Sequence, residues 1–240
     1  MAETQRWQAI PTQLELAEFE QFVLPHLSIG SRDPAPKLSL YKIFNYVLKI
    51  LCLGCQWKEL PIDKDGDGTT TAAKKGGDNL GFSGHKKVKG DKVVAFCDRH
   101  CNVIAPFVAA RGNRNESPLL RTALPEVMRI VREAGMDLCG TIVSLDGVYD
   151  CQVNRKAIFN RGMVPNINPN PRGRKQPKPG RKPIFEPAIF KERFWTIERV
   201  FAWEDKFRRL LLRFERISGL HYAFKTLAYT MINLRHYCQT

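Results

Sequence analysis

The stretch Thr141-Ile-Val-Ser-Leu-Asp146-Gly147 places an aspartate directly after a short apolar run. Upstream, Lys92-Val-Val-Ala-Phe-Cys-Asp98 has the same design. Apolar runs of this length that end on an acid predict buried β-strands. Such a strand is held by the core while its last residue emerges into a crevice, where catalytic acids are found. Taken alone, each aspartate is also explained as the first residue of a turn.

A third acid, Glu198, lies in the segment Arg193-Phe-Trp-Thr-Ile-Glu198-Arg199-Val-Phe-Ala-Trp203, which predicts a strongly apolar helix. Arginines and lysines crowd both sides of this half-buried glutamate. A carboxylate among so many cations is typical of a metal ligand that lies beside a polyanion. The alternative is an ordinary amphipathic helix in which Glu198 pairs with a neighbouring arginine.

The overall charge points to a polyanionic partner. The 240 residues carry a formal net charge of +14, and their number is enough for one good core plus a small appendage. Nucleic acid is favoured over a membrane, because no apolar run of about 18 residues occurs and the start of the chain has no signal-peptide pattern. We therefore expect a cytoplasmic, nucleoid-associated protein.

Two patterns in the sequence resemble metal sites but have simpler explanations. The seven cysteines form close groups only at Cys52-Leu-Gly-Cys55 and Cys97-Asp-Arg-His100-Cys101, neither of which has a second pair at a zinc-finger spacing. Structural or incidental thiols are the preferred interpretation. Residues 63–68 resemble the start of an EF-hand loop, but Lys74 stands where calcium binding requires a glutamate.

Helices are predicted at the start of the chain. Thr12-Gln-Leu-Glu15 is a capping box that opens one helix, and Ser39 is expected to cap a second. They form a small helical unit over residues 1–60, followed by a glycine-rich connector over residues 61–91. Within the connector, Gly76 to Gly90 fits either a flexible loop near nucleic acid or a hairpin that leads into the Lys92 strand.

The remaining elements alternate between strands and helices. Two short strands are expected after Asp98, and Asn115-Glu116 then opens a helix. Asp150 is expected to cap the helix after the Asp146 strand, because a carboxylate suits a helix N-terminus. The apolar stripe that begins near Glu198 predicts a long helix that Gly219 stops, with a last helix over residues 222–237.

The order of the three acids resembles that of the DDE transposases encoded by bacterial and archaeal insertion sequences. The match includes the blocks Asp146-Gly-Val-Tyr-Asp150 and Glu198-Arg-Val-Phe-Ala-Trp, and it extends from about residue 68 to the end of the chain. Other similar blocks are Gly81-Phe-Ser-Gly-His85, Met163-Val-Pro-Asn-Ile, Phe207-Arg-Arg-Leu-Leu-Leu-Arg-Phe-Glu215 and Leu227-Ala-Tyr-Thr-Met-Ile-Asn-Leu-Arg235.

The resemblance implies an α/β fold in residues 92–240, a ribonuclease-H-like mixed sheet with helices on both faces. It also implies that Asp98, Asp146 and Glu198 hold two Mg²⁺ (or Mn²⁺) ions about 4 Å apart, one for the attacking hydroxyl and one for the leaving oxygen. Mg²⁺ prefers oxygen ligands, with which three carboxylates agree. The family tends to carry Asp where Glu116 stands, so Glu116 is an auxiliary position at most.

Besides the three acids, several arginines and lysines are expected to contact DNA. Between the second and third acids lies an insertion over residues 166–187 that contains a basic tract broken by Pro and Gly, which is either a linker or a DNA-contacting segment. We favour DNA contact. The full set of expected DNA-binding residues is Arg155, Lys156, Arg172, Arg174, Lys175, Arg181, Lys182, Arg199, Lys206 and Arg209.

Three functions follow. The favoured one is a transposase, an endonuclease for DNA transposition and recombination that cleaves at terminal inverted repeats and joins the freed 3′-hydroxyl to target DNA, as a homodimer on DNA by analogy with the family. The second is a catalytically silent remnant that only binds DNA, since the sequence near Asp63 indicates an internal deletion. The third is a stand-alone metal-dependent nuclease, which would show no selectivity for transposon ends.

Overall fold

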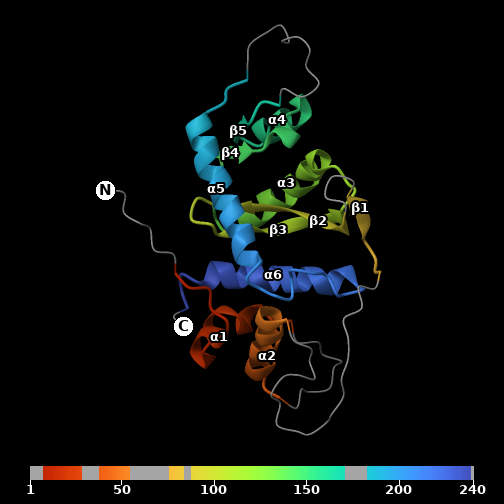
Figure 1. Ribbon diagram of the computed structural model, residues 1–240. Helices are drawn as coiled ribbons and strands as arrows, with labels where there is room; N and C mark the ends of the chain where they lie inside the picture. Colours follow the sequence, from red (N-terminus) through yellow and green to blue (C-terminus); the bar gives the residue numbers. More distant parts are fainter. Residues whose placement is uncertain (1–7, 29–37, 55–75, 84–87, 171–182, 239–240) are drawn as a thin grey trace, which may run out of the picture. The chain divides into compact units, whose positions relative to one another are not determined.

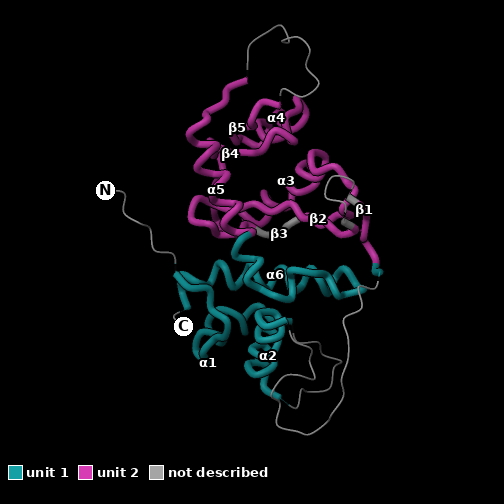
Figure 2. The backbone as a smooth tube through the Cα atoms, in the orientation of Figure 1, with its two compact units in different colours: residues 1–77, 202–240 teal, residues 78–201 magenta. Residues whose placement is uncertain are grey.

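The computed structural model describes residues 8–28, 38–54, 76–83, 88–170 and 183–238 (Figure 1). They belong to two compact units (Figure 2). The first, here called the sheet unit, consists of residues 78–201, and the second, the helical unit, consists of residues 1–77 together with 202–240. Asp98, Asp146 and Glu198 all belong to the sheet unit.

The first sheet of the sheet unit is an antiparallel sheet of three strands. β1 (Gly81–Ser83), β2 (Val88–Cys97) and β3 (Val103–Arg111) lie in the order β1-β2-β3. Of the two alternatives for the segment ahead of Lys92, the pairing of β1 with β2 agrees with the hairpin, and the strand expected before Asp98 is confirmed. The two short strands expected after Asp98 are a single strand, β3, whose pairing with β2 shifts register between Val94 and Phe96.

The second sheet is a parallel pair built from a strand–helix–strand unit. β4 (Ile142–Leu145) leads through the 3₁₀-helix η3 (Gly147–Tyr149) and helix α4 (Gln152–Phe159) to β5 (Val164–Ile167). Helix α3 (Glu116–Glu133) contacts β2 and β3 and also η3 and α4 (Figure 1). The buried core between these elements consists of Leu120, Leu124, Ile158, Met163 and Ile167.

The α/β class is confirmed by this mixture of sheets and helices. The finer expectation, a single ribonuclease-H-like mixed sheet, stays a prediction, because the described strands form one sheet of three strands and a separate sheet of two. Asn115 caps α3 as predicted, with its Oδ1 accepting a hydrogen bond from the Ser117 N–H at 3.0 Å.

The helical unit contains α1 (Leu16–Phe22), the 3₁₀-helix η1 (Leu24–His26), α2 (Leu40–Leu53) and α6 (Ser218–Leu234). Ser39 caps α2 as predicted. The predicted start of α1 is wrong by one turn: the capping box is formed by Glu15 and Glu18, whose carboxylate accepts a hydrogen bond from the Glu15 N–H at 2.9 Å. Thr12 lies ahead of the helix.

The long helix predicted from Glu198 to Gly219 is not formed. Helix α5 (Pro187–Glu204) ends at Glu204, and Gly219 lies inside α6 rather than stopping a helix. The backbone N–H groups of Arg208 and Arg209 donate to the carbonyls of Cys52 (3.4 Å) and Leu51 (3.2 Å) at the end of α2. These N–H groups thus bond to carbonyls of α2 instead of forming a further turn of α5.

Several expectations concern residues outside the described ranges. They concern the calcium-loop resemblance at residues 63–74, Cys55, and the basic tract over residues 172–182. The domain ranges 1–60, 61–91 and 92–240 stay predictions, and the compact units group residues 202–240 with the N-terminal helices. No helix within the described residues has the length and apolar character needed to cross a membrane.

Candidate active site

Asp98 closes the turn that joins β2 to β3. Its Oδ1 accepts hydrogen bonds from the backbone N–H groups of His100 (2.9 Å) and Asn102 (2.8 Å), and its Oδ2 accepts one from Asn102 Nδ2 (2.9 Å). Cys101 has a φ of 64°, the left-handed conformation that lets the chain reverse. The half-buried carboxylate is both a strand-end acid and a turn residue, and its direction is fixed by its own turn.

Asp146 follows β4 and caps η3. Its Oδ1 accepts a hydrogen bond from the Gly147 N–H at 2.5 Å, and its side chain is exposed. Gly147 lies close to the segment after β5, since a Cβ at this position would be 3.4 Å from Asn168 O and from Asn170 Cβ. Asp146 therefore emerges at the C-terminal ends of a parallel strand pair, the position expected of a strand-delivered acid.

Glu198 lies on the open face of α5. Thr196 and Val200, two residues before and after it, are buried, whereas Glu198 is exposed rather than half-buried as expected. Within the part of the chain that the structure describes, no cation lies within 4.0 Å of its carboxylate. The alternative that Glu198 serves as an ordinary helix ion pair is therefore not supported by its surroundings.

Helix α5 is attached to both aspartate-bearing regions of the sheet unit. At its N-terminal end, Asn166 on β5 donates from Nδ2 to Glu186 O (3.2 Å) and accepts from the Glu186 N–H at 2.8 Å. Further along, Cys101 in the Asp98 turn donates from Sγ to Thr196 O at 3.7 Å. The helix that carries Glu198 thus contacts the turn of Asp98 and the strand paired with that of Asp146.

The three acids do not form a metal-binding group in this structure. Among the described residues, no three His, Cys, Asp or Glu side chains lie close enough to hold one ion. Their oxygen donors match the preference of Mg²⁺, but their arrangement does not. Sharing of ions by Asp98, Asp146 and Glu198 would require them to move closer together.

The Cys97 thiol, next to Asp98, is in an environment that keeps it protonated. Burial, followed by the charges of Cys101 and Asp98, raises the pKa of Cys97 to about 12 against a lowering effect of Arg193. Since the thiolate is the metal ligand and the nucleophile, a raised pKa works against both roles. The six cysteines of the described residues are all free.

The expected DNA-binding residues occupy different surroundings. Arg155 is mostly buried and forms an ion pair with Asp150 at 3.0 Å, whereas its neighbour Lys156 is exposed. Arg209 is half-buried in the helical unit and pairs with Glu215 at 2.7 Å. Arg199 is half-buried on α5, Lys206 is exposed in the helical unit, and five residues lie outside the described ranges: Arg172, Arg174, Lys175, Arg181 and Lys182.

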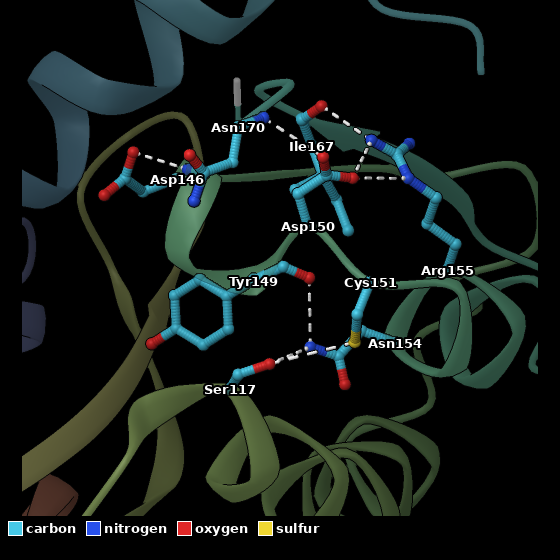
Figure 3. Close-up of polar contacts among 10 residues, drawn as sticks. Ser117, Asp146, Tyr149, Asp150, Cys151, Asn154, Arg155, Ile167 and Asn170 are labelled. Carbon is cyan, nitrogen blue, oxygen red and sulfur yellow. Dashed lines mark hydrogen bonds and ion pairs between the residues drawn. The ribbon is translucent and has the colours of Figure 1, made fainter. Parts of the chain in front are cut away.

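The prediction that Asp150 caps helix α4 is wrong. The N-cap of α4 is Cys151, which makes no side-chain cap bond, so Asp150 does not cap that helix. Its carboxylate instead accepts hydrogen bonds from Arg155 and from the N–H of Asn170, twenty residues further along the chain (Figure 3). No local sequence signal indicates a partner at that separation.

Glu116 also has a role beyond opening α3. Its Oε1 lies 3.0 Å from Lys92 Nζ on β2. Burial, then the charges of Glu116 and Asp146, raise the pKa of Tyr149, the last residue of η3. Glu116 is therefore in electrostatic contact with both the strand that ends at Asp98 and the short helix that follows Asp146.

Comparison with known proteins shows the family to which the chain belongs. The family described as "Transposase DDE domain" matches residues 61–234, and the chain belongs to this family. A curated protein of Burkholderia cepacia described as "Putative transposase for insertion sequence element IS402" is 34% identical over 91 residues, which are 38% of this chain. The similar region spans 37% of that relative's length. No solved structure matches the chain.

Proposed function

We propose that the chain catalyses DNA strand cleavage and strand transfer at the ends of an insertion sequence, acting on DNA in the cytoplasm. The observation that carries the proposal is the family match over residues 61–234, a range that contains Asp98, Asp146 and Glu198. Two of these acids follow strands directly and the third is exposed on α5. The partners in this proposal are the terminal inverted repeats and target DNA, bound by a homodimer.

In the proposal, the three carboxylates hold two divalent ions, Mg²⁺ or Mn²⁺. Such ions activate an attacking hydroxyl and stabilise the leaving oxygen of a phosphodiester. Because the acids do not form one group in this structure, the proposal includes their approach when DNA is bound. The turn hydrogen bonds of Asp98 and the tethers of α5 limit which parts move, and the exposed side chains of Asp146 and Glu198 leave their oxygens accessible.

The silent remnant is not favoured by these comparisons. The family match begins at residue 61, within the region read as a deletion, and continues past all three acids. A formal charge of +14 is equally consistent with DNA binding by an enzyme or by a remnant, so charge does not separate them. Cleavage does.

A strand-cleavage assay on DNA that carries the element's terminal repeats tests the proposal. With Mg²⁺ or Mn²⁺, the wild type is expected to nick at the repeat boundary, and Asp146→Asn to bind the DNA but cut it at least about 100-fold more slowly. Asp137→Asn is the matched control, because Asp137 is also an exposed carboxylate that accepts a backbone N–H, from Cys139 at 2.9 Å. Binding without cutting by the wild type would instead support the remnant.

A further inference from the structure

The carboxylate of Asp150 is fully engaged inside the sheet unit. Its Oδ1 accepts hydrogen bonds from Arg155 Nε (3.2 Å) and Nη2 (3.0 Å), and its Oδ2 accepts one from the Asn170 N–H at 3.0 Å. The side chains of Asp150 and Arg155 are 5% and 14% exposed. Burial of such a pair is costly unless further hydrogen bonds accompany it, and here both carboxylate oxygens of Asp150 accept hydrogen bonds.

These bonds connect three segments around the turn that carries Asp146 (Figure 3). Asp150 stands at the end of the turn, Arg155 lies on α4, and Asn170 follows β5. Arg155 Nη2 also donates to Ile167 O at the end of β5, at 2.9 Å. The exit of the Asp146 turn is therefore bound to the segment after β5, the same segment against which Gly147 packs.

A second contact holds the middle of the same turn. Asn154 is 0% exposed, and its Nδ2 donates to Tyr149 O (3.1 Å) and to Ser117 Oγ (2.9 Å) (Figure 3). Its Oδ1 accepts a hydrogen bond from Arg121 Nη1 at 2.9 Å. Ser117 and Arg121 both lie on α3. The turn is thus fixed to α3 through Tyr149 and to the end of β5 through Asp150.

We propose that Asp150 is a positioning residue: by pairing with Arg155 and the Asn170 N–H, it fixes the turn that presents Asp146. The proposal rests on the proposed role of Asp146 as a metal-binding acid. The Asp146 side chain accepts a hydrogen bond from the adjacent Gly147 N–H, and its carbonyl accepts one from the Tyr149 N–H at 3.0 Å, so its direction depends on how the turn is held. Hydrogen-bond partners behind a metal ligand typically change metal affinity or activity about 10–100-fold when removed.

The first test measures amide hydrogen exchange in the metal-free protein. Asp150→Asn keeps the shape of the side chain but removes its charge, and we expect about tenfold faster exchange in peptides that cover residues 146–151 and 167–170. Val131→Ala is the matched control, because Val131 is 1% exposed on α3, so this change lowers stability while every hydrogen-bonding residue named above stays unchanged. Unchanged exchange in Asp150→Asn would overturn the proposal.

The second test measures Mn²⁺ binding by electron paramagnetic resonance and cleavage of terminal-repeat DNA. Asp150→Asn should need about tenfold more Mn²⁺ for half-maximal binding and cleavage, with unchanged affinity for DNA, while Val131→Ala should need no more than the wild type. A faster-exchanging turn with wild-type Mn²⁺ dependence would reduce Asp150 to a structural residue and contradict the proposal. Failure of the wild type to cut DNA would count against the proposed function alone, because the exchange measurement still decides the role of Asp150 in the turn.

Discussion

Two glutamates of the helical unit and two candidate catalytic acids of the sheet unit are held in opposite ways. Glu204 and Glu215 in the helical unit are 8% and 7% exposed, and each has a cationic partner. Glu204 contacts Lys225 and Tyr229, and Glu215 contacts Arg209. Asp146 and Glu198 in the sheet unit are exposed. Buried, paired acids are explained by the packing of the fold, whereas exposed acids at the ends of strands or on an open helix face are not.

Burial and neighbouring charges shift the pKa values of Glu215 and Tyr229 in the helical unit. Burial works to raise the pKa of Glu215, but its interactions with His221 and Arg209 outweigh burial and lower the pKa to about 2. Burial and the charge of Glu204 together raise the pKa of Tyr229. The helical unit therefore keeps Glu204 and Glu215 as part of a charge network whose removal is expected to cost stability.

Removal of one glutamate from each unit should show the largest contrast. Glu204→Ala leaves Lys225 and Tyr229 buried without their acceptor, so the free energy of unfolding should fall by roughly 3–5 kcal/mol. Glu198→Ala should change it by less than about 0.5 kcal/mol, because the side chain is exposed. Urea unfolding measures both. Equal losses would mean that Glu198 is also a structural acid.

Acid should weaken the helical unit through Glu215. Its folded pKa of about 2 lies below the unfolded value of 4.5, so its stabilising contribution is complete above pH 4.5 and is lost as the pH falls towards 2. The loss is on the order of 3 kcal/mol. Unfolding of the wild type and of Glu215→Gln should be compared between pH 5 and pH 2.5. A parallel pH dependence in the two proteins would contradict this assignment.

The smallest expected effect is a difference in the free energy of unfolding between changes in the Asp98 turn and in the Asp146 turn of the sheet unit. Asp98 accepts three hydrogen bonds from its own turn, so Asp98→Ala should lower the free energy of unfolding by about 1–2 kcal/mol. Asp146 accepts one, from the adjacent residue, and Asp146→Ala should cost less than about 0.5 kcal/mol. Thermal unfolding measures the difference. A larger loss for Asp146 would show that its turn depends on the carboxylate itself.

Features with local signals could be predicted from the sequence. The strands before Asp98 and Asp146 follow from short apolar runs, and the caps at Ser39 and Asn115 follow from side chains that bond within one turn. The α/β class followed from their alternation along the chain. The three candidate acids also have local signals, because Asp98 and Asp146 follow apolar runs and Glu198 lies among cations on an apolar helix.

Features that depend on distant partners could not be predicted. The end of α5 depends on α2 carbonyls that accept the Arg208 and Arg209 N–H groups. Asp150 fitted a helix cap, but its partner at Asn170 lies beyond a helix and a strand. The distance between the three acids could not be predicted either, because it depends on how separate elements pack and not on any one segment.

Binding of Mn²⁺ in the presence of terminal-repeat DNA tests most directly whether Asp98, Asp146 and Glu198 act together. Electron paramagnetic resonance counts the bound ions in the wild type and in three variants, each with one of these acids changed to alanine. We expect two ions per chain in the wild type and at least about tenfold weaker binding in every variant. Wild-type Mn²⁺ binding in all three variants would show that these acids do not share ions and would contradict the proposed site.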